Sequence, residues 1–494
     1  MRGYPGRVDT ELLEHYLGDR SRAAGPTPGD PTGRAGGAAC GDLIEVSLRV
    51  EGGIVTGVSQ SGSGCAAARA AAAAVAELAD GAPLLNAARI DAAAISAELG
   101  GLSPVGAHAA DLAAEALHRA LGVAVLIAEE PLLEPPQDGE RVLVAVSGGV
   151  DSAVAALLER RGGAEVVAMT LELWADPAND GEASCCSASA VRAARALAHA
   201  QGIPHLTVDL RDAFRAGVVE PFLEGYAAGV TPNPCVRCNG RVRIEPMTGI
   251  AERLGAAALA TGHYARVVAE PGGPLLSAAA DDAKDQTYML AALPAEVLAR
   301  MRFPLGDLTK PQVRELAAEA GLPVATKAES QDLCFLAGVG KAGFLAAHGG
   351  LADRDGEIVT SGGEVIGSHR GHHLFTVGQR RGIGVASPEP LYVLGTDAAA
   401  NRVTVGTASE LEVEGVAIRD VVLHRPADRV GSIRLRYRSR PLECRVAGGG
   451  HGAPAAGRHE RLDVRLGAPA RAGAPGQTAV LLDGDLVVGH GTIA

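Results

Sequence analysis

The sequence lacks any apolar run that approaches the ~20 residues of a membrane-spanning helix. Its first stretch, Met1 to Arg22, is charged and interrupted by proline and glycine, so it has no apolar signal core. It also lacks an internal repeat, and we interpret its alanine-rich tracts as compositional bias within helices. These absences predict a globular protein of the cytoplasm with no membrane partner.

Cysteine is scarce, and its arrangement argues against a disulfide framework. Eight cysteines occur in 494 residues, among them the adjacent Cys185 and Cys186 and the Cys-x-x-Cys pair Cys235 and Cys238. Such pairs favour metal or sulfur chemistry over structural disulfides. A second Cys-x-x-Cys that would complete a four-thiolate zinc site is missing. We expect Cys444 to be an inert core thiol.

The net charge of −13 is unevenly distributed. Residues 1–140 carry 9 basic and 19 acidic side chains, a net of −10, whereas residues 416–494 carry 12 and 7, a net of +5. Arginines alternate from Arg434 to Arg440, and on a strand they would share one face. Such a face could neutralise the phosphates of a nucleic acid, with a solvated strand face as the equal alternative.

The chain is long enough for several domains, and its pattern changes along its length. We predict a multidomain protein: an α+β domain at 1–128, a proline-rich linker at 129–140, a doubly wound α/β domain at 141–338, a small mostly β central domain at 339–408 and a β-barrel at 409–494. The strands expected in the first two domains are 43–50, 53–59, 142–146, 165–171, 205–209 and 257–261. The expected helices are 66–78, 107–121, 153–160, 188–200 and 243–254.

A buried strand that begins at Arg141 runs directly into the turn Ser147-Gly-Gly-Val-Asp-Ser152. Gly148 and Gly149 let backbone N–H groups approach an anion, and the next helix points its N-terminus at the same place. The Gly-Lys-Ser/Thr of a Walker A loop is absent, so a different use of ATP is implied. The segment resembles the PP-loop of ATP pyrophosphatases, which adenylate an oxygen and release pyrophosphate.

Three thiols follow the loop in two motifs. Thr231-Pro-Asn-Pro-Cys-Val-Arg-Cys-Asn239 places two of them in a proline-stiffened segment, and Ser330-Gln-Asp-Leu-Cys-Phe335 offers Cys334. Two thiols at this spacing can form a disulfide, hold a metal or pass a persulfide, and Arg237 between them would favour the thiolate.

Two polar clusters accompany these cysteines. Gly262 and His263 lie at an expected strand end, where ligands of parallel sheets bind, although a structural histidine is an equal reading of His263. Lys284 could offset the negative charge of an adenylate or of a tRNA phosphate.

With these motifs, residues 141–494 resemble the tRNA-specific 2-thiouridylases. The shared segments are Ser147–Ser152, Ser184–Ser187, Asn233–Asn239, Thr261–Arg266, Lys284–Gln286, Phe303–Gly306, Ser330–Phe335, Phe375–Gly384 and Pro390–Val393. The resemblance implies an adenine nucleotide alpha hydrolase-like parallel-sheet domain. It also implies that ATP activates O2 of the wobble uridine and that sulfur replaces this oxygen. The expected partners are tRNAs for glutamate, glutamine and lysine and a cysteine desulfurase as sulfur donor.

By the same resemblance, the site residues fall into three groups. ATP with Mg²⁺ would bind at Ala145, Val146, Ser147, Gly148, Gly149, Val150, Asp151, Ser152, Met169 and Gly262. The tRNA would contact Asn233, Pro234, Cys235, Lys284, Asp285, Gln286, Arg436 and Arg438. Cys238 would be the nucleophile and Cys334 the persulfide carrier, the pair passing through a disulfide. In the alternative, Cys235, Cys238 and Cys334 would hold a [4Fe-4S] cluster with one iron open to hydrosulfide.

The first domain carries a second candidate site, formed by Cys40, Asp42, Cys65 and His108. These side chains are competent for zinc or an iron–sulfur cluster. Residues 1–125 resemble the IscU/NifU-type scaffolds on which clusters are assembled. Those scaffolds follow this histidine with a third cysteine, where this chain has Ala109. The departure weakens the case for cluster assembly and leaves metal binding or a purely structural role.

A scaffold domain fused to a tRNA-thiolating enzyme would raise the local concentration of the sulfur or cluster donor. Two other functions stay open. Another PP-loop ATP pyrophosphatase, such as a lysidine or argininosuccinate synthetase, would not need Cys238 and Cys334. A noncatalytic iron–sulfur carrier with a degenerate ATPase domain would not need Ser147, Asp151 and Ser152.

Overall fold

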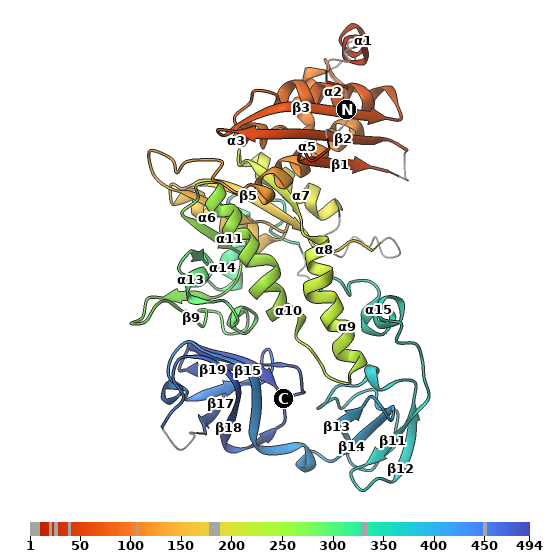
Figure 1. Cartoon of the computed structure of the whole chain (residues 1–494), viewed down its shortest axis with the longest axis vertical. Helices are drawn as coiled ribbons and strands as arrows, with labels where there is room; N and C mark the ends of the chain where they lie inside the picture. The colour runs from red at the N-terminus through yellow and green to blue at the C-terminus, as the bar shows by residue number, and fades with distance from the viewer. Residues whose placement is uncertain are drawn as a thin grey trace.

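The computed structural model describes residues 10–18, 22–23, 28–37, 41–104, 106–176, 188–327, 333–447 and 452–494. Cys40, the pair Cys185 and Cys186, and residues 330–332 lie outside this description. The described chain forms four units, with an N-terminal α+β domain at one end of the molecule and two β domains at the other (Figure 1). This order confirms the fold class predicted from the sequence. No helix among the described residues is long and apolar enough to cross a membrane.

The N-terminal domain is a three-stranded antiparallel sheet with helices packed against it. Its strands lie in the order β1-β2-β3 and are β1 (Thr32–Gly36), β2 (Leu43–Glu51) and β3 (Ile54–Ser63). Its helices are α1 (Thr10–Gly18), α2 (Ala66–Ala79), α3 (Leu84–Ala87), α4 (Ala92–Glu98) and α5 (Ala107–Ile127). Alternate residues of β2, Ile44, Val46 and Leu48, are fully buried, so one face of the sheet supplies the core that α2 and α5 cover.

The second unit is an α/β domain built on a five-stranded parallel sheet. Its strands, in the spatial order β10-β7-β4-β5-β6, are β4 (Arg141–Ala145), β5 (Glu165–Glu172), β6 (His205–Asp209), β7 (Ala258–Thr261) and β10 (Met301–Arg302). Its helices are α6 (Val150–Arg161), α7 (Ala188–Ala200), α8 (Arg211–Phe214), η1 (Arg215–Val219), α9 (Glu220–Ala227), α10 (Pro234–Arg237), η2 (Cys238–Arg243), α11 (Ile244–Arg253), α12 (Thr287–Leu290), α13 (Ala295–Leu298) and α14 (Lys310–Glu319). The four strands expected here are confirmed, and the apolar run of β4 is buried because helices cover both faces of the sheet.

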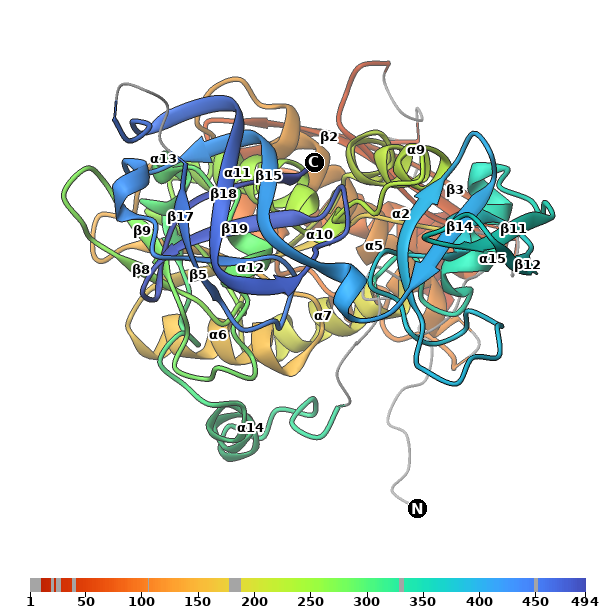
Figure 2. The same cartoon turned by 90° about the horizontal axis from the view of Figure 1, so that it is seen from below.

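The two C-terminal units are β domains that lie side by side (Figure 2). The central domain contains α15 (Gly340–Gly349), η3 (His372–Leu374) and a sheet of order β12-β11-β14-β13, with β11 (Gly356–Thr360), β12 (Val365–His369), β13 (Tyr392–Asp397) and β14 (Arg402–Gly406). The last unit contains η4 (Ser409–Leu411), η5 (Ala427–Arg429), β15 (Glu412–Leu423), β16 (Ser432–Arg434), β17 (Leu442–Val446), β18 (Gly457–Arg471), β19 (Thr478–Asp483) and β20 (Leu486–Ile493). Because β15 pairs with both β18 and β20, six of these strands close into the expected barrel, and β9 (Leu275–Ser277) and β8 (Arg266–Val268) extend from β20.

Helix α5 joins the N-terminal domain to the parallel sheet. It packs against β1 and β2 of its own domain and against β6, the edge strand of the parallel sheet. Arg119 of α5 donates to Glu172 at the end of β5 through Nε at 3.0 Å and Nη2 at 2.5 Å. Residues 129–140 are packed too, since the N–H groups of Leu132 and Leu133 donate to the carbonyl of Arg253. The two domains therefore share one hydrophobic core.

This docking depends on Gly122, where α5 passes closest to β6. A Cβ atom at this position would lie 1.8 Å from the carbonyl oxygen of Thr207. We expect Gly122→Ala to destabilise the docked domains by about 1–3 kcal/mol, because a backbone atom cannot move aside. Thermal unfolding and limited proteolysis measure this. Gly249→Ala on α11 is the control, since its Cβ would meet only Arg253 Nη1 at 3.5 Å. An unchanged or higher melting temperature for Gly122→Ala would contradict the prediction.

Three histidines meet at the same interface: His118 of α5, His199 of α7 and His205 of β6. The ring centroids are 5.2 to 6.4 Å apart. His118 has carbonyl oxygens at both ring nitrogens, that of His205 at 2.7 Å from Nδ1 and that of Ile90 at 2.9 Å from Nε2. Burial lowers the pKa of His118 and of His205 well below the usual value, and the charge of Arg195 adds to the effect on His118.

This cluster predicts acid sensitivity. The unfolded chain binds protons on these histidines below pH ~6.5, whereas the folded chain does not. Stability is therefore complete above that pH and falls as the pH drops below it. We expect the melting temperature to decrease from pH 7 to pH 5.5, and to decrease less in His118→Gln/His205→Gln. His459→Gln, on the barrel surface, should keep the wild-type slope, and equal slopes in all three proteins would refute the assignment.

Candidate functional site

The predicted phosphate loop connects β4 to α6 and closes on itself through Ser152. The N–H of Ser147 donates to Ser152 Oγ at 3.1 Å, and that hydroxyl donates to the carbonyl of Gly149 at 3.2 Å. Gly148 has a φ of +69°, a conformation that favours glycine. Helix α6 begins three residues before the expected 153–160, because Gly149 is its N-cap. Val150, Asp151 and Ser152 thus form the first turn, whose N–H groups lack intrahelical acceptors and can face an anion.

Gly262, at the end of β7, lies directly against this first turn. A Cβ there would be 2.6 Å from the backbone nitrogen of Ser152 and 2.7 Å from the carbonyl carbon of Asp151. Strands β4 and β7 are parallel neighbours, so their carboxyl ends meet at the loop. Glycine is therefore required here for close approach. Ala145, Val146 and Gly262 lie at the same strand ends, and their contact with ATP stays a prediction.

Sequence reasoning gave no role to two lysines and a tyrosine that reach the loop. Lys310 Nζ donates to both carboxylate oxygens of Asp151 at 2.7 Å, and the hydroxyl of Tyr264 donates to Oδ1 at 2.9 Å. Lys327 Nζ donates to the carbonyl of Gly148 at 3.0 Å. The sequence Thr309-Lys-Pro-Gln312 predicts only the capping box of α14. The residues around Lys310 therefore give no sign that its side chain reaches the loop.

Met169 is buried, whereas His263 is partly exposed at the end of β7. The Met169 side chain is fully buried in the core, and its carbonyl accepts from Val146 N at 2.8 Å. His263 Nδ1 lies 2.8 Å from Thr261 Oγ1. Burial, followed by the charge of Arg243, lowers the pKa of His263 to about 3. The imidazole is therefore neutral at physiological pH, and a contact between Met169 and adenine stays a prediction.

The three expected reactive cysteines lie in the same domain, and no disulfide joins them. Cys238 is buried and opens the π-helical segment η2, Cys334 is half-buried, and both contact the main core. Burial raises the pKa of Cys235, an effect that the charge of Arg243 opposes. Arg237, expected to favour the thiolate, instead donates Nε to the carbonyl of Gly217 at 2.5 Å. Arg237 is the last residue of the short helix α10, and from there its side chain is directed to Gly217 rather than to the cysteines.

The segments predicted to contact tRNA connect these cysteines to the loop. Asn233 caps α10, accepting from Val236 N at 3.2 Å, and Pro234 follows as the first helical residue. Asn239 donates Nδ2 to the carbonyl of Met289 at 3.2 Å. Gln286 Oε1 accepts from Tyr264 N at 2.9 Å, and Tyr264 in turn reaches the loop. Residues 286–289 therefore connect the segment that holds the cysteines to the phosphate loop.

Asp285 is placed as an anchor between domains. Its side chain is 6% exposed. It accepts from Thr287 Oγ1 at 2.8 and 3.0 Å and from Arg434 Nη1 of the barrel at 2.9 Å. Lys284, next to it, is half-buried. Little of the Asp285 carboxylate is left for an RNA contact, so its predicted role toward tRNA gains no support from its position.

The arginine run does not form one strand face. Strand β16 ends at Arg434, whose side chain turns to Asp285. Arg436 and Arg438 lie on the following bend and turn, where Arg438 has a φ of +59°. The expectation of alternating charges along a strand is therefore corrected. Arg436 and Arg438 are nevertheless exposed and available to phosphates.

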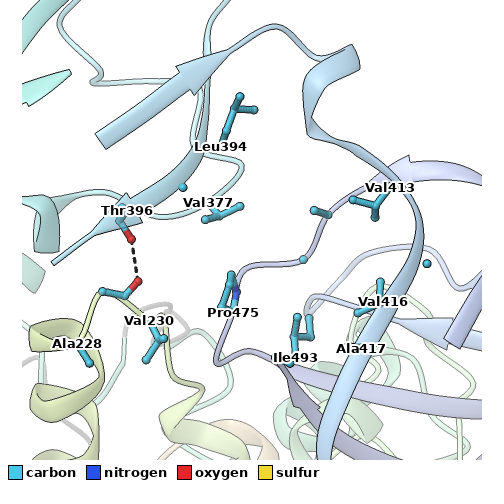
Figure 3. Close-up of a pocket in the computed structure, with 16 residues that line it drawn as sticks. Ala228, Val230, Val377, Leu394, Thr396, Val413, Val416, Ala417, Pro475 and Ile493 are labelled. Atoms are coloured by element: carbon cyan, nitrogen blue, oxygen red, sulfur yellow. Dashed lines mark hydrogen bonds between the residues drawn. The ribbon is translucent and has the colours of Figure 1, made fainter. Parts of the chain in front are cut away.

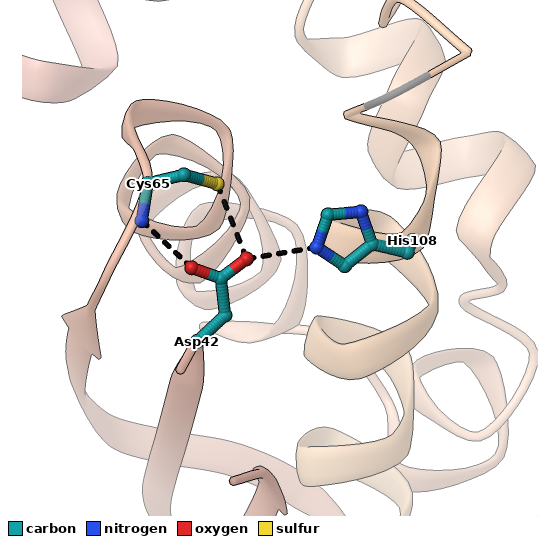
Figure 4. Close-up of side chains that lie close together, drawn as sticks. All are labelled: Asp42, Cys65 and His108. Atoms are coloured by element: carbon teal, nitrogen blue, oxygen red, sulfur yellow. Dashed lines mark hydrogen bonds and ion pairs between the residues drawn. The ribbon is translucent and has the colours of Figure 1, made fainter. Parts of the chain in front are cut away.

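Three of the four N-terminal candidate ligands converge (Figure 4). Asp42 precedes β2, Cys65 caps α2 and His108 lies in the first turn of α5. Asp42 Oδ2 lies 2.8 Å from His108 Nε2 and accepts from Cys65 Sγ at 3.2 Å, while Oδ1 accepts from Cys65 N at 2.7 Å. These hydrogen bonds, led by that of Cys65 N, lower the pKa of Asp42. The buried Ala109 offers no further ligand.

Among the described residues, this trio is the only group of three or more His, Cys, Asp or Glu whose ligand atoms all lie within 4.8 Å of one another. Cys235, Cys238 and Cys334 do not form such a group, so the structure presents no compact single-ion site there. The thiols of a larger iron–sulfur cluster are spaced by the cluster itself and need not approach so closely. The three cysteines remain compatible donors for one.

A cleft of about 410 Å³ lies where α9, the central domain and the barrel meet (Figure 3). Val230, Val377, Leu394 and Ile493 line it, and Thr396 Oγ1 donates to the carbonyl of Gly229 at 2.8 Å beside it. Its lining contains no ionisable side chain. The cleft therefore offers no charged side chain to a ligand.

Four family models match the chain in succession. Their descriptions are NifU-like N terminal domain (residues 9–123), tRNA methyl transferase HUP domain (140–338), tRNA methyl transferase PRC-barrel domain (342–407) and Aminomethyltransferase beta-barrel domain (420–493). Together they follow the four structural units in order.

Named proteins of other organisms are similar to this chain over the same domains. A protein of Rubrobacter xylanophilus named "Bifunctional protein NifU/MnmA" is 42% identical and aligns with 99% of each chain. Two proteins named "tRNA-specific 2-thiouridylase MnmA" are also similar. That of Sorangium cellulosum is 45% identical over 73% of this chain and 94% of its own, and that of Geobacter metallireducens is 42% identical over 72% and 96%. The chain therefore belongs to the tRNA-specific 2-thiouridylase family, in the form that carries a NifU-like domain before the catalytic domains.

Proposed function

We propose that the protein is a tRNA 2-thiouridine synthase that uses ATP to activate O2 of a wobble uridine and then replaces this oxygen with sulfur. The observation that carries the proposal is a continuous chain of hydrogen bonds and adjacent residues between the phosphate loop and the cysteine segment. The phosphate loop at Asp151 is joined through Tyr264 and Gln286 to the segment that holds Asn239, next to Cys238. Family membership supports the same reaction.

In the first step, the uridine oxygen attacks the α-phosphorus of ATP. A bond forms between O2 and this phosphorus, the bond to the bridging oxygen of the β-phosphate breaks, and pyrophosphate leaves with the electron pair. The first turn of α6 would bind phosphate oxygens through N–H groups. Asp151 offers the oxygen ligands that Mg²⁺ prefers, and this ion would neutralise phosphate charge.

In the second step, sulfur displaces AMP. The terminal sulfur of a persulfide on Cys334 attacks C2, and the C–O bond breaks with its electrons on AMP. The Cys238 thiolate then attacks the Cys334 sulfur, the S–S bond to the uridine sulfur breaks, and 2-thiouridine and a Cys238–Cys334 disulfide result. An external thiol reductant restores both thiols. Should Cys235, Cys238 and Cys334 hold a [4Fe-4S] cluster instead, it would supply an iron that binds hydrosulfide.

The test is thiolation of unmodified tRNAs for glutamate, glutamine and lysine by full-length protein purified without oxygen. Nucleoside mass spectrometry should detect one 2-thiouridine per tRNA, together with AMP and pyrophosphate, only when ATP and a sulfur source are present. Product that forms without ATP would refute the first step. Full activity of iron-free protein given a persulfide donor would exclude the cluster version.

For the N-terminal domain we propose metal binding at Asp42, Cys65 and His108, with Cys40 as a further candidate ligand. One thiol, one carboxylate and one imidazole within 4.8 Å form a donor set that suits zinc. The fused domain would receive sulfur from a cysteine desulfurase and keep it close to the catalytic thiols. Metal analysis of Cys65→Ala against Cys444→Ala tests the site: only the former should lose bound metal, and equal contents would contradict it.

A further inference from the structure

We propose that Lys310 is the cation that binds the pyrophosphate half of ATP, and that Asp151 holds it in place until the nucleotide arrives. The proposal rests on the proposed use of ATP and deepens it. It assigns a phosphate ligand to a loop that contains no lysine of its own.

The position of Lys310 is built into the fold. It is the first residue of α14, after a capping box between Thr309 and Gln312, and its backbone N–H donates to Asp281 Oδ2 at 2.9 Å. Its side chain is 9% exposed and reaches the first turn of α6, where Nζ lies 2.7 Å from both oxygens of Asp151. The Lys310 ammonium therefore lies at the phosphate loop, where it donates to Asp151 and lies over the ring of Tyr264.

Charge balance explains why the loop needs this group. The phosphate chain of ATP is strongly anionic, and Asp151 adds a negative charge at the same helical turn. The helix N-terminus offsets only about half an elementary charge. Lys310 at Asp151 and Lys327 at the Gly148 carbonyl bring two ammonium groups to the loop from the segment after β10.

The composition makes this placement unusual. The chain has four lysines, Lys284, Lys310, Lys327 and Lys341, among 45 basic residues. Two of the four contact the loop, in a protein that otherwise uses arginine. Lysine offers a compact, rotatable point charge, which can move between neighbouring oxygens where a planar guanidinium would not fit as easily.

The arrangement implies an exchange of partners. If Asp151 held Mg²⁺, the ion would offset the negative charge of Asp151, and the Lys310 ammonium would turn to an oxygen of the β- or γ-phosphate. Tyr264 keeps Asp151 in position through its hydroxyl, because Gln286 fixes the Tyr264 backbone. As the bond to the bridging oxygen breaks, Lys310 stabilises the charge that accumulates on pyrophosphate. No proton changes place in this step.

The test compares pyrophosphate binding to full-length wild type, Asp151→Asn and Asp151→Asn/Lys310→Met by calorimetry in EDTA. Without Mg²⁺, wild-type Lys310 is engaged by Asp151. Asp151→Asn releases it and should tighten pyrophosphate binding about tenfold, the scale of one hydrogen bond to a charged group. The added Lys310→Met should cancel that gain. The double variant removes both charges of the Asp151–Lys310 pair together, so it is expected to fold.

Two further measurements make each outcome decisive. AMP affinity should be equal in all three proteins, because Lys310 serves the pyrophosphate half. Arg161→Met removes an exposed cation at the opposite end of α6 and should change neither affinity. Equal pyrophosphate affinity in Asp151→Asn and the double variant would overturn the role of Lys310. A wild type that binds neither ATP with Mg²⁺ nor pyrophosphate would instead overturn the proposed use of ATP.

Discussion

Cys238→Ala and Cys334→Ala are each expected to lower tRNA thiolation more than about 10³-fold, the scale seen when a nucleophile is removed. Both variants should still release pyrophosphate from ATP in the presence of tRNA, because the phosphate loop is unchanged. The reason is the division of labour: the first step needs the loop, and only the second needs thiols. Quantifying 2-thiouridine and pyrophosphate in the same reaction separates the steps.

Cys444→Ala is the matched control for these variants. Cys444 is buried in the barrel, where burial raises its pKa to about 12, so it is an inert thiol. Its loss should leave thiolation unchanged. Cys235→Ser separates the two sulfur mechanisms, since the persulfide route needs only the other two cysteines. Retained thiolation in Cys238→Ala or Cys334→Ala would refute both routes.

Asp285→Ala should destabilise the folded protein by about 3–5 kcal/mol, the cost of leaving one partner of a buried ion pair alone. The change removes the acceptor of Arg434 and of Thr287 at the junction between the α/β domain and the barrel. Arg434 is only 19% exposed, so water cannot fully replace the carboxylate. Urea denaturation monitored by fluorescence and by proteolysis of the barrel measures the loss.

Asp282→Ala tests whether this effect belongs to the anchor. Asp282 is exposed three residues earlier in the same segment, and its removal should shift the denaturation midpoint little. A direct role of Asp285 in tRNA binding would give another pattern: weaker tRNA binding at unchanged stability. That pattern would contradict the anchor.

Much of the catalytic domain could be predicted because its determinants are local. An apolar run that ends in Ser147-Gly-Gly-Val-Asp-Ser152 specifies a strand, a turn and a helix start within a dozen residues. Gly262 follows an expected strand, and the structure shows why glycine is needed there: a backbone contact with Ser152 leaves no room for Cβ. The prediction that the arginines from Arg434 to Arg440 share one strand face was wrong, because a turn at residues 436–439 follows the end of the strand.

The partners of charged side chains could not be predicted in this way. Arg237 lies between the two cysteines in sequence, but it is the charge of Arg243, further along the chain, that lowers the pKa of Cys235 against the effect of burial. Asp285 belongs to a segment that the sequence assigns to tRNA, and it binds an arginine 149 positions away. Such pairs depend on how domains pack, and spacing along the chain carries no information about that.

The sequence by itself determined the kind of chemistry, because the phosphate loop and the thiol motifs are contiguous segments whose residue types state what they can do. Tertiary structure alone decided which ammonium serves the loop, which carboxylate anchors the barrel, and how α5 fixes the N-terminal domain on strand β6. Lys310 lies 159 positions from Asp151 and Gly122 lies 85 positions from Thr207. Contacts at such separations form only when the parallel sheet brings the strand ends together and buried backbone and charge must find partners.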